Sequence, residues 1–386
     1  MKILIIGDVN NNYIIEKAEW LKRDTEVSKI DLFTFYDITS DNSTKLGYRT
    51  ICANKYINQN ALQLFDENSK NTIRFYSQIA ALFELDDDYD IAQVHYVECA
   101  IANVLPILKL KCKKIIVNIW GSDLLRSTEI QDQYRTKIYD QADLITMRKN
   151  DLIISKFRMK YPNYENKTIK FVKMGADIFN QLRELMNSIS KIDCKKILNL
   201  DTNKIIITIG YQADYNHKHI EILDLLLKER TIIENLNNII FLLPLTYGAT
   251  EAEKDKIIEY YSSKPIQFIY FRSFLSFSQV CMIRYASDIF INLLTTDAFS
   301  NSMREYLYTK NVVITGSWLP YDDLIDKGYY FRRIKSLQNI SEELAFVLKN
   351  FKIEKEKCVI NDDTLLAFSD WSIFIKEWID IYKKIL

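Results

Sequence analysis

Glycine is scarce in this chain: only 8 of its 386 residues are glycine, against an average of roughly 7%. Phosphate-binding loops built from several glycines must therefore be rare. Neither G-x-G-x-x-G after a candidate strand nor G-x-x-x-x-G-K-[ST] occurs. These absences weigh against a standard dinucleotide site and against P-loop phosphoryl transfer. No G-x-S-x-G elbow occurs either, which weakens an α/β-hydrolase interpretation.

Other features that mark particular protein classes are missing as well. The six cysteines are scattered without a C-x-x-C pair, which favours reduced thiols in a cytosolic protein and argues against zinc. Lys plus Arg and Asp plus Glu both number 51, so no global charge attracts nucleic acid. No apolar run approaches the ~20 residues of a membrane span. The opening MKILIIGDV is too short for a signal peptide, so we expect a cytoplasmic protein.

Short apolar runs alternate with helical patterns along most of the chain. The first series has strand patterns at 2–6, 30–35, 91–94, 114–119 and 144–146, with helices at 14–23, 72–85, 98–110 and 151–159. After an irregular polar stretch at 180–201, strands recur at 204–209, 238–243, 266–271, 289–293 and 312–315. Helices of this second series fit at 218–229, 251–262, 277–286 and 302–308. Such alternation predicts parallel sheets covered by helices on both faces.

Two such series predict an α/β protein with two doubly wound, Rossmann-like domains and a ligand cleft between them. We expect an N-terminal domain over 1–180 and a C-terminal domain over 200–368. A Trp- and Ile-rich amphipathic helix over 369–386 is expected to pack back on the N-terminal domain.

The stretch TTDAFSNSMREYL, residues 295–307, places two acids eight positions apart. Asp297 lies in the loop expected after a strand, and Glu305 lies one turn into the following helix. The amides of Ser300–Ser302 at that helix start suit a diphosphate, and the carboxylates suit sugar hydroxyls. The alternative, an N-capped helix with Glu305 in solvent, is equally compatible with this stretch alone.

The surrounding sequence resembles the GT-B nucleotide-sugar glycosyltransferases, and within them glycosyltransferase family 4. ASDIFINLLTTDAFSNSMREYLYTKNVVITG is similar to that family's C-domain signature, with Asp297 and Glu305 at its two acidic positions. IITIGYQADYNHKHIEILDLL resembles the strand–Gly loop–Lys–helix that opens the nucleotide-binding domain. IIVNIWGSDLLRS, ADLITMRKNDLI and FVKMGADIFN resemble segments of the N-domain and the linker.

The resemblance implies an enzyme, a glycosyltransferase of EC class 2.4 that moves a sugar from a nucleotide-diphosphate donor to a glycan, lipid-linked or protein acceptor. It implies retention of configuration, no bound metal and no cofactor, in bacterial surface glycan synthesis. It also implies that the N-terminal domain binds the acceptor and that the C-terminal domain binds the nucleotide sugar. Asp297, Glu305 and His95 are the candidate catalytic residues. The candidates for binding the nucleotide sugar are Gly210, Tyr211, Asn216, His217, Lys218, His219, Tyr247, Arg272, Phe299, Ser300, Asn301, Ser302 and Glu305.

On the acceptor side, the candidates are Asp8, Trp120, Gly121 and Asp123, and His95 could orient an acceptor or act as a base. His95 could equally be a ring packed at a strand end, and Asp123 could be a helix N-cap. The chain departs from the family pattern at Tyr211, where Arg is common, and at Trp120, where His is common. For Trp120, a modified donor sugar is one explanation and a shifted pocket is another. A weaker local similarity to 4-acetamido-4,6-dideoxygalactose transferases agrees with the first.

Two charged runs leave further alternatives open. DDDYD at 86–90 could suggest a metal site, but a solvated acidic turn before a strand is the better interpretation. LKLKCKK at 108–114 could contact the inner face of the cell membrane, or could be a solvated helix end. A sugar-nucleotide epimerase of the same architecture, or a catalytically degenerate partner subunit of a transferase, also fits the sequence.

Overall fold

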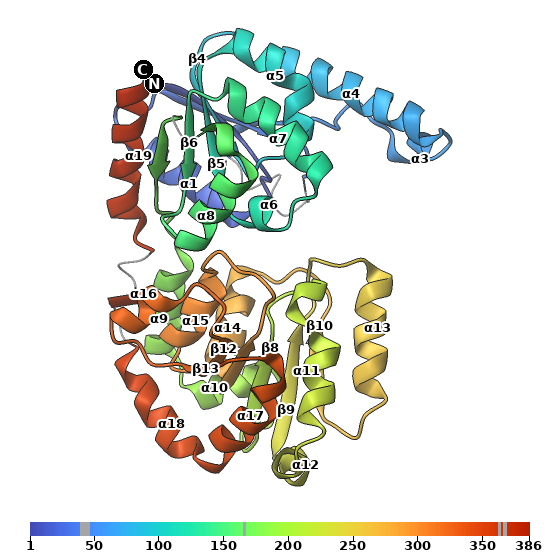
Figure 1. Cartoon of the computed structure of the whole chain (residues 1–386), viewed down its shortest axis with the longest axis vertical. Coiled ribbons are helices and arrows are strands. Elements are labelled where there is room, and N and C mark those ends of the chain that lie inside the picture. The colour runs from blue at the N-terminus through green and yellow to red at the C-terminus, as the bar shows by residue number, and fades with distance from the viewer. Residues whose placement is uncertain (39–46, 165–166, 362–363, 366–368) are drawn as a thin grey trace. The chain divides into compact units, whose positions relative to one another are not determined.

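The structure is a computed structural model that describes residues 1–38, 47–164, 167–361, 364–365 and 369–386 (Figure 1). The chain forms two compact units. Unit 1 comprises Met1–Ala176 together with Ser369–Leu386, and unit 2 comprises Asp177–Phe368. Each unit has its own parallel sheet and is described by itself.

Unit 1 is built on a seven-stranded parallel sheet in the order β3-β2-β1-β4-β5-β6-β7. Its strands are β1 (Lys2–Ile6), β2 (Lys29–Thr34), β3 (Arg49–Cys52), β4 (Tyr89–His95), β5 (Cys112–Ile119), β6 (Leu144–Met147) and β7 (Ile169–Phe171). Its helices are α1 (Asn12–Lys22), α3 (Gln59–Leu62), α4 (Glu67–Phe83), α5 (Ala100–Lys111), α6 (Ser122–Leu125), α7 (Glu129–Gln141), α8 (Asp151–Lys160) and α19 (Trp371–Ile385). The central strands are almost fully buried, as a sheet covered on both faces requires.

The C-terminal helix α19 is part of unit 1 and lies against α1 (Figure 1). Its Trp371 Nε1 donates to the Glu16 carboxylate over 2.9 Å, and Trp378 and Tyr382 are buried. Lys17 of α1 is fully buried, 2.7 Å from Gln93 Oε1 and 3.1 Å from the centroid of the Trp378 ring. Burial holds the pKa of Lys17 well below its usual value, because the interior disfavours the ammonium.

Unit 2 is built on a six-stranded parallel sheet in the order β10-β9-β8-β11-β12-β13. Its strands are β8 (Ile205–Ile209), β9 (Ile239–Pro244), β10 (Phe268–Phe271), β11 (Ile289–Asn292), β12 (Val312–Gly316) and β13 (Arg332–Ile334). Its helices are α9 (Ile178–Ser188), α10 (Lys191–Ile197), α11 (His219–Leu226), α12 (Arg230–Asn235), α13 (Glu251–Ser262), α14 (Phe277–Ala286), α15 (Asn301–Tyr308), α16 (Asp322–Asp326), α17 (Ile340–Lys349) and α18 (Phe351–Lys357). Isoleucine and leucine side chains of β8, β9 and β11 form the centre of its core.

The structure corrects the expected irregular stretch at 180–201, which contains most of α9 and all of α10. Ile178, Phe179 and Leu182 of α9 are buried along one side at helical spacing, so the helix is amphipathic. The polar residues between them made this segment look irregular in the sequence. The short strands β3 and β7 and the helix α7 were not expected either. α7 buries only Arg135, Ile138 and Tyr139, too few for a clear apolar period.

Candidate functional site

The strand order of unit 2 reverses direction between β8 and β11. The chain runs from β8 to β9 and β10 on one side, and from β11 to β12 and β13 on the other. In open α/β sheets, ligands bind at such a switch point, outside the carboxyl ends of the strands. Two loops leave the sheet there: residues 210–218 after β8 and residues 295–300 before α15. Most of the predicted donor-side residues lie on these two loops.

Asn216 ties the two loops together. Its side chain is 3% exposed, and its Oδ1 accepts the Thr295 N–H over 2.9 Å while its Nδ2 donates to the Thr296 carbonyl over 3.1 Å. The Asp214 carboxylate accepts the Asn216 N–H over 2.8 Å. Asn216 was predicted to bind the nucleotide sugar, and in the structure its side chain links the loop at 210–218 to the loop at 295–300. That partnership spans 79 residues and leaves no local sequence signal.

Gly210 turns the chain at the end of β8 with φ +65°, a conformation that favours glycine. A Cβ at this position would lie 2.8 Å from His217 Nδ1 and 3.0 Å from His219 Cε1. The His217 ring is packed edge-on against Tyr211, with centroids 4.4 Å apart. The first strand–loop connection of unit 2 therefore needs glycine because two histidine rings occupy the space beside it.

His219 carries no charge at neutral pH. Its Nε2 lies 2.8 Å from the Gln212 carbonyl, and burial lowers its pKa to about 4. His219 is therefore a neutral, packed imidazole, and its contact with a phosphate stays a prediction. Lys218 beside it has a positive φ of 52°, and its Nζ lies 5.8 Å from the centroid of the Trp318 ring. Within the described ranges Lys218 has no acidic partner, so its charge is available at this edge of the sheet.

Asp297 is buried and folds back on its own loop. Its carboxylate accepts the Ala298 N–H over 2.7 Å, the Ser300 N–H over 3.2 Å and the Tyr321 hydroxyl. Burial raises its pKa, and these hydrogen bonds oppose that shift. Phe299, between the two amides, has φ +74°, a strained value for a non-glycine residue. The Ser300 amide, expected to hold phosphate, is thus used by Asp297, while Asn301 and Ser302 occupy the first turn of α15, where amides lack intrahelical acceptors.

Glu305 is also buried, and it forms an ion pair that the sequence did not suggest. Its Oε2 accepts the Arg284 Nε–H over 2.9 Å, and both side chains are 7% exposed. Arg284 also donates to the Tyr306 hydroxyl over 2.8 Å and the Ser302 hydroxyl over 3.2 Å. The charged group of Arg284 thus binds three residues of α15. The sequence hinted at this pair only through the position of Arg284 in the apolar helix α14, because a cation is unusual where burial is expected.

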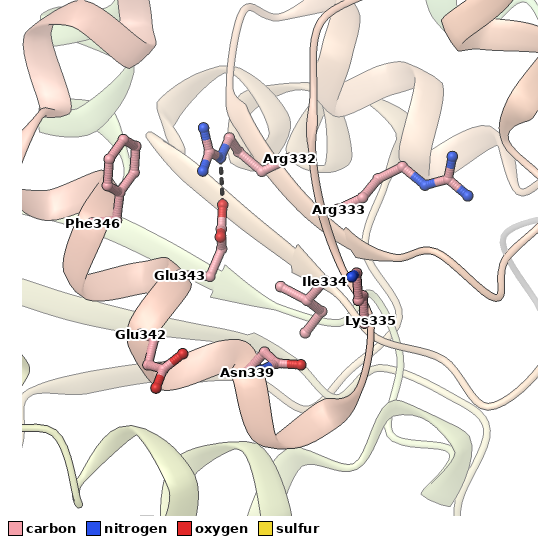
Figure 2. Close-up of a pocket in the computed structure, with 8 residues that line it drawn as sticks. All are labelled: Arg332, Arg333, Ile334, Lys335, Asn339, Glu342, Glu343 and Phe346. Carbon is pink, nitrogen blue, oxygen red and sulfur yellow. Dashed lines mark hydrogen bonds and ion pairs between the residues drawn. The ribbon is translucent and has the colours of Figure 1, made fainter.

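The two remaining donor-side candidates lie on neighbouring strand ends. Tyr247 follows β9 and is 47% exposed. Arg272 follows β10 and pairs with Glu251 and Asp255 of α13, 2.7 Å from the latter. Its charge is therefore balanced within the unit. A separate cavity of about 310 Å³ lies between β13 and α17, lined by Arg332, Arg333, Ile334, Lys335, Asn339, Glu342, Glu343 and Phe346 (Figure 2). None of the candidate residues lines this cavity.

In unit 1, the strand order reverses between β1 and β4, and the acceptor-side candidates follow strands near this point. Asp123 is 1% exposed; it accepts the N–H groups of Trp120 over 3.0 Å, Gly121 over 2.8 Å and Val97 over 3.1 Å. It therefore joins the loops after β4 and β5, and the N-cap position of α6 belongs to Gly121, with φ +116°. Asp8 accepts the N–H of Asn10 over 2.9 Å after β1.

His95 is packed at the end of β4 and is 1% exposed. Its Nδ1 lies 3.2 Å from both Trp120 Nε1 and Asn118 Nδ2. The indole N–H can only donate, so Nδ1 is the acceptor and the ring proton is assigned to Nε2. Burial, with the nearby Lys17, holds the pKa of His95 well below its usual value. The structure thus favours the packed-ring alternative over a general base.

The acidic run at 86–90 is ion-paired, partly with the basic run at 108–114. Lys111 pairs with Asp87, Lys113 with Asp90 and Lys2 with Asp88, while Asp86 pairs with Lys29 and Arg49. DDDYD is therefore an ion-paired turn, and half of the lysines of LKLKCKK are its partners. Among the described residues no group of three His, Cys, Asp or Glu side chains could hold a metal. In the same residues, no helix is both long and apolar enough to cross a bilayer.

No protein-family model matches the sequence, and no curated protein sequence matches it either. Solved structures do match over the whole chain. A glycosyltransferase from Rickettsia africae ESF-5 aligns with TM-score 0.66 and 11% identity, covering 100% of this chain and 98% of that one. HepE from Anabaena, in complex with UDP and glucose, aligns with TM-score 0.70 and 13% identity, covering both chains completely.

An alpha,alpha-trehalose-phosphate synthase (UDP-forming) from Burkholderia vietnamiensis aligns with TM-score 0.69 and 11% identity, over 100% of this chain and 97% of that one. These similarities confirm the predicted fold class, two Rossmann-like units of the GT-B type. At such low identity they define the fold, and the chemistry has to be argued from the residues.

Proposed function

We propose that this protein is a glycosyltransferase that moves a sugar from a nucleoside-diphosphate donor to a hydroxylated acceptor. Unit 2 binds the donor and unit 1 presents the acceptor. The observation that carries the proposal is the pair of loops at the unit 2 switch point. Asn216 fastens them to each other, and they bring Lys218 and the start of α15 to the carboxyl edge of the sheet.

The chemistry of this edge suits a diphosphate leaving group. Lys218 supplies a positive charge without an acidic partner in the described part of the chain, and Trp318 lies beside it, anchored by its Nε1–H to the Leu294 carbonyl over 2.8 Å. The first-turn amides of α15 add N–H donors and the positive end of a helix dipole. Together these groups stabilise the charge that develops when the bond to the anomeric carbon breaks. UDP is the first nucleotide to test, because the HepE structure contains it.

The finer assignments follow from the family resemblance and belong to the same proposal. The reaction retains configuration and needs no resident metal or cofactor. The protein acts in the bacterial cytoplasm in surface glycan synthesis, with a glycan, lipid-linked or protein acceptor. Contact with the inner face of the membrane would need a source of charge other than Lys111 and Lys113, because both are paired with aspartates.

A second candidate is a catalytically degenerate partner subunit of an active transferase. The observation that favours it is that both signature acids are occupied: Asp297 by its own loop and Glu305 by Arg284. A partner subunit of this kind could bind a nucleotide through Lys218 without transferring a sugar. Product formation separates this candidate from the first.

Binding of UDP is the direct test. At a ligand concentration of ~100 Kd the unfolding free energy should rise by ~2.7 kcal/mol, visible in a thermal shift and confirmed by calorimetry. Lys218→Ala should weaken UDP binding, whereas Lys228→Ala, an exposed lysine beyond the opposite end of α11, should not. Absence of binding to UDP and to a panel of other nucleoside diphosphates would overturn the proposal.

A further inference from the structure

A group of lysines at the amino edge of the unit 2 sheet takes no part in the proposed donor site, which lies at the carboxyl edge. The group surrounds Asp288, the residue before β11, whose side chain is only 9% exposed. Lys191 and Lys195 of α10 place their amines 3.0 Å and 2.7 Å from its two carboxylate oxygens. The same carboxylate accepts the Ile206 N–H over 3.0 Å, so three donors already share it.

The amine of Lys355 enters this group from α18. Its Nζ donates a hydrogen bond to the carbonyl of Lys310, in the connection between α15 and β12. The amine of Lys191 is its hydrogen-bonding neighbour on the other side. No Asp or Glu of the described residues forms an ion pair with Lys355. The third amine of the group therefore lies beside another cation and has no carboxylate of its own.

Lys355 holds its proton weakly as a result. Burial disfavours the ammonium and the charge of Lys191 adds to this effect, whereas Asp288 and Cys358 oppose it, and the balance lowers the pKa of Lys355 to about 7. An ordinary lysine is uncharged in only about one molecule in 2,500 at pH 7. About half of the Lys355 amines are uncharged at that pH. A desolvated amine beside a second cation is one of the ways in which proteins make a lysine nucleophilic.

The same surroundings favour an anionic reagent. A phosphate group beside Lys191 and Lys355 would accept hydrogen bonds from both amines and offset their mutual repulsion. The Lys191 side chain is 23% exposed and Lys355 is partly exposed, so neither is sealed inside the unit. An acyl phosphate combines the anion that these cations attract with the electrophilic carbon that an uncharged amine attacks.

We propose that Lys355 is a site of covalent acylation by acyl phosphates. This inference goes beyond the proposed function and does not depend on it. The uncharged Nζ forms a bond to the acyl carbon, and the bond from that carbon to the phosphate oxygen breaks. The phosphate leaves with the electron pair of the broken bond, and the surplus proton of the amine passes to solvent. The products are an amide at Lys355 and a free phosphate.

The test treats the whole protein with acetyl phosphate between about pH 6 and 9 and measures the acetylation rate of each lysine by quantitative peptide mass spectrometry. Lys352, an exposed lysine of the same helix, is the internal control. At pH 7 Lys355 should react at least about 10-fold faster than Lys352. The rate at Lys355 should level off above about pH 8, whereas the rate of an ordinary lysine with a pKa of about 10.4 rises throughout this range.

Two further measurements address the surroundings of the amine. Lys191→Met removes the neighbouring cation, so acetylation of Lys355 at pH 7 should slow at least about 3-fold and its plateau should move to higher pH. Lys196→Met, which removes an exposed lysine of α10 that pairs with Asp193, should change neither. Inorganic phosphate at constant ionic strength should slow the reaction at Lys355 and not at Lys352, because it competes for the same amines.

The outcomes are distinct. Equal rates at Lys355 and Lys352 at pH 7, or a Lys355 rate that climbs without a plateau, would overturn the proposal. A Lys355 rate that inorganic phosphate leaves unchanged would overturn the acyl phosphate as the reagent of this site. If the melting curve shows that Lys191→Met is unfolded, the plateau and the phosphate competition in the wild type decide.

Discussion

The buried ion pair between Arg284 and Glu305 makes the stability of unit 2 sensitive to the loss of either partner. Replacing Glu305 by Leu leaves the Arg284 guanidinium without its carboxylate in a site where both side chains are 7% exposed. A guanidinium cannot lose its proton at any pH at which the protein folds, so it cannot escape by neutralisation. Removing one partner of such a pair costs about 3–5 kcal/mol.

For a cooperative unit of this size, each kcal/mol lowers Tm by about 2–4 °C, so Glu305→Leu should lower Tm by roughly 6–20 °C. The double variant Arg284→Met/Glu305→Leu should recover most of this loss, because apolar side chains of similar volume often replace a buried pair at little cost. The control is Glu234→Leu, which breaks the exposed pair with Arg230 and should cost less than about 1 kcal/mol.

The assay is differential scanning calorimetry of the three variants, followed by UDP titration of the double variant. A Glu305→Leu protein no less stable than the Glu234→Leu control would refute the argument that Arg284 holds this carboxylate. If the double variant is stable but has lost UDP affinity, Glu305 also contacts the nucleotide. If it binds UDP normally, the role of Glu305 is structural, namely to pair with Arg284 and hold α15 in place.

Three further predictions concern the loops of unit 2. Asn216→Ala removes the hydrogen bonds to Thr295 and Thr296, so UDP affinity should fall and the free energy of unfolding should drop by about 1–3 kcal/mol. The calorimetric control is Asn350→Ala, which breaks one exposed hydrogen bond, to the Phe346 carbonyl. Gly210→Ala places a methyl group 2.8 Å from His217 Nδ1 at positive φ and should abolish UDP binding; retained affinity would contradict this. The pKa of His219 is about 4 in the folded protein and about 6.5 in the unfolded chain. The contribution of the neutral ring to stability is therefore complete above pH 6.5 and is lost as the pH falls towards 4. His219→Gln should flatten that part of the stability profile, measured by denaturation at different pH values.

The alternation of strands and helices was readable from the sequence because buried parallel strands are short and apolar. The expected strands at 2–6 and 289–293, for example, correspond to β1 and β11. The segment at 180–201 was misjudged because its helices α9 and α10 bury few residues. A helix can be recognised from its sequence only when enough apolar residues recur at helical spacing to form a broad buried face.

The candidate site was predicted less completely, for a different reason. The loops and their order along the sheet follow from the strand pattern, but hydrogen-bond partners do not. Asn216 accepts a hydrogen bond from Thr295, which is 79 residues away in the sequence. Arg284 pairs with Glu305, which is 21 residues away. Whether a carboxylate faces a ligand or another side chain depends on such partners.

The position of α19 has a consequence for biosynthesis. Unit 1 begins at the first residue yet uses Trp371, Trp378 and Tyr382 to close its interior. During synthesis, the sheet of unit 1 therefore stays uncovered on that side until residues 371–382 have been made, whereas unit 2 is one contiguous segment and is complete before then. Expression of residues 1–176 alone should yield an aggregation-prone fragment, and adding the last helix as a separate peptide should rescue it.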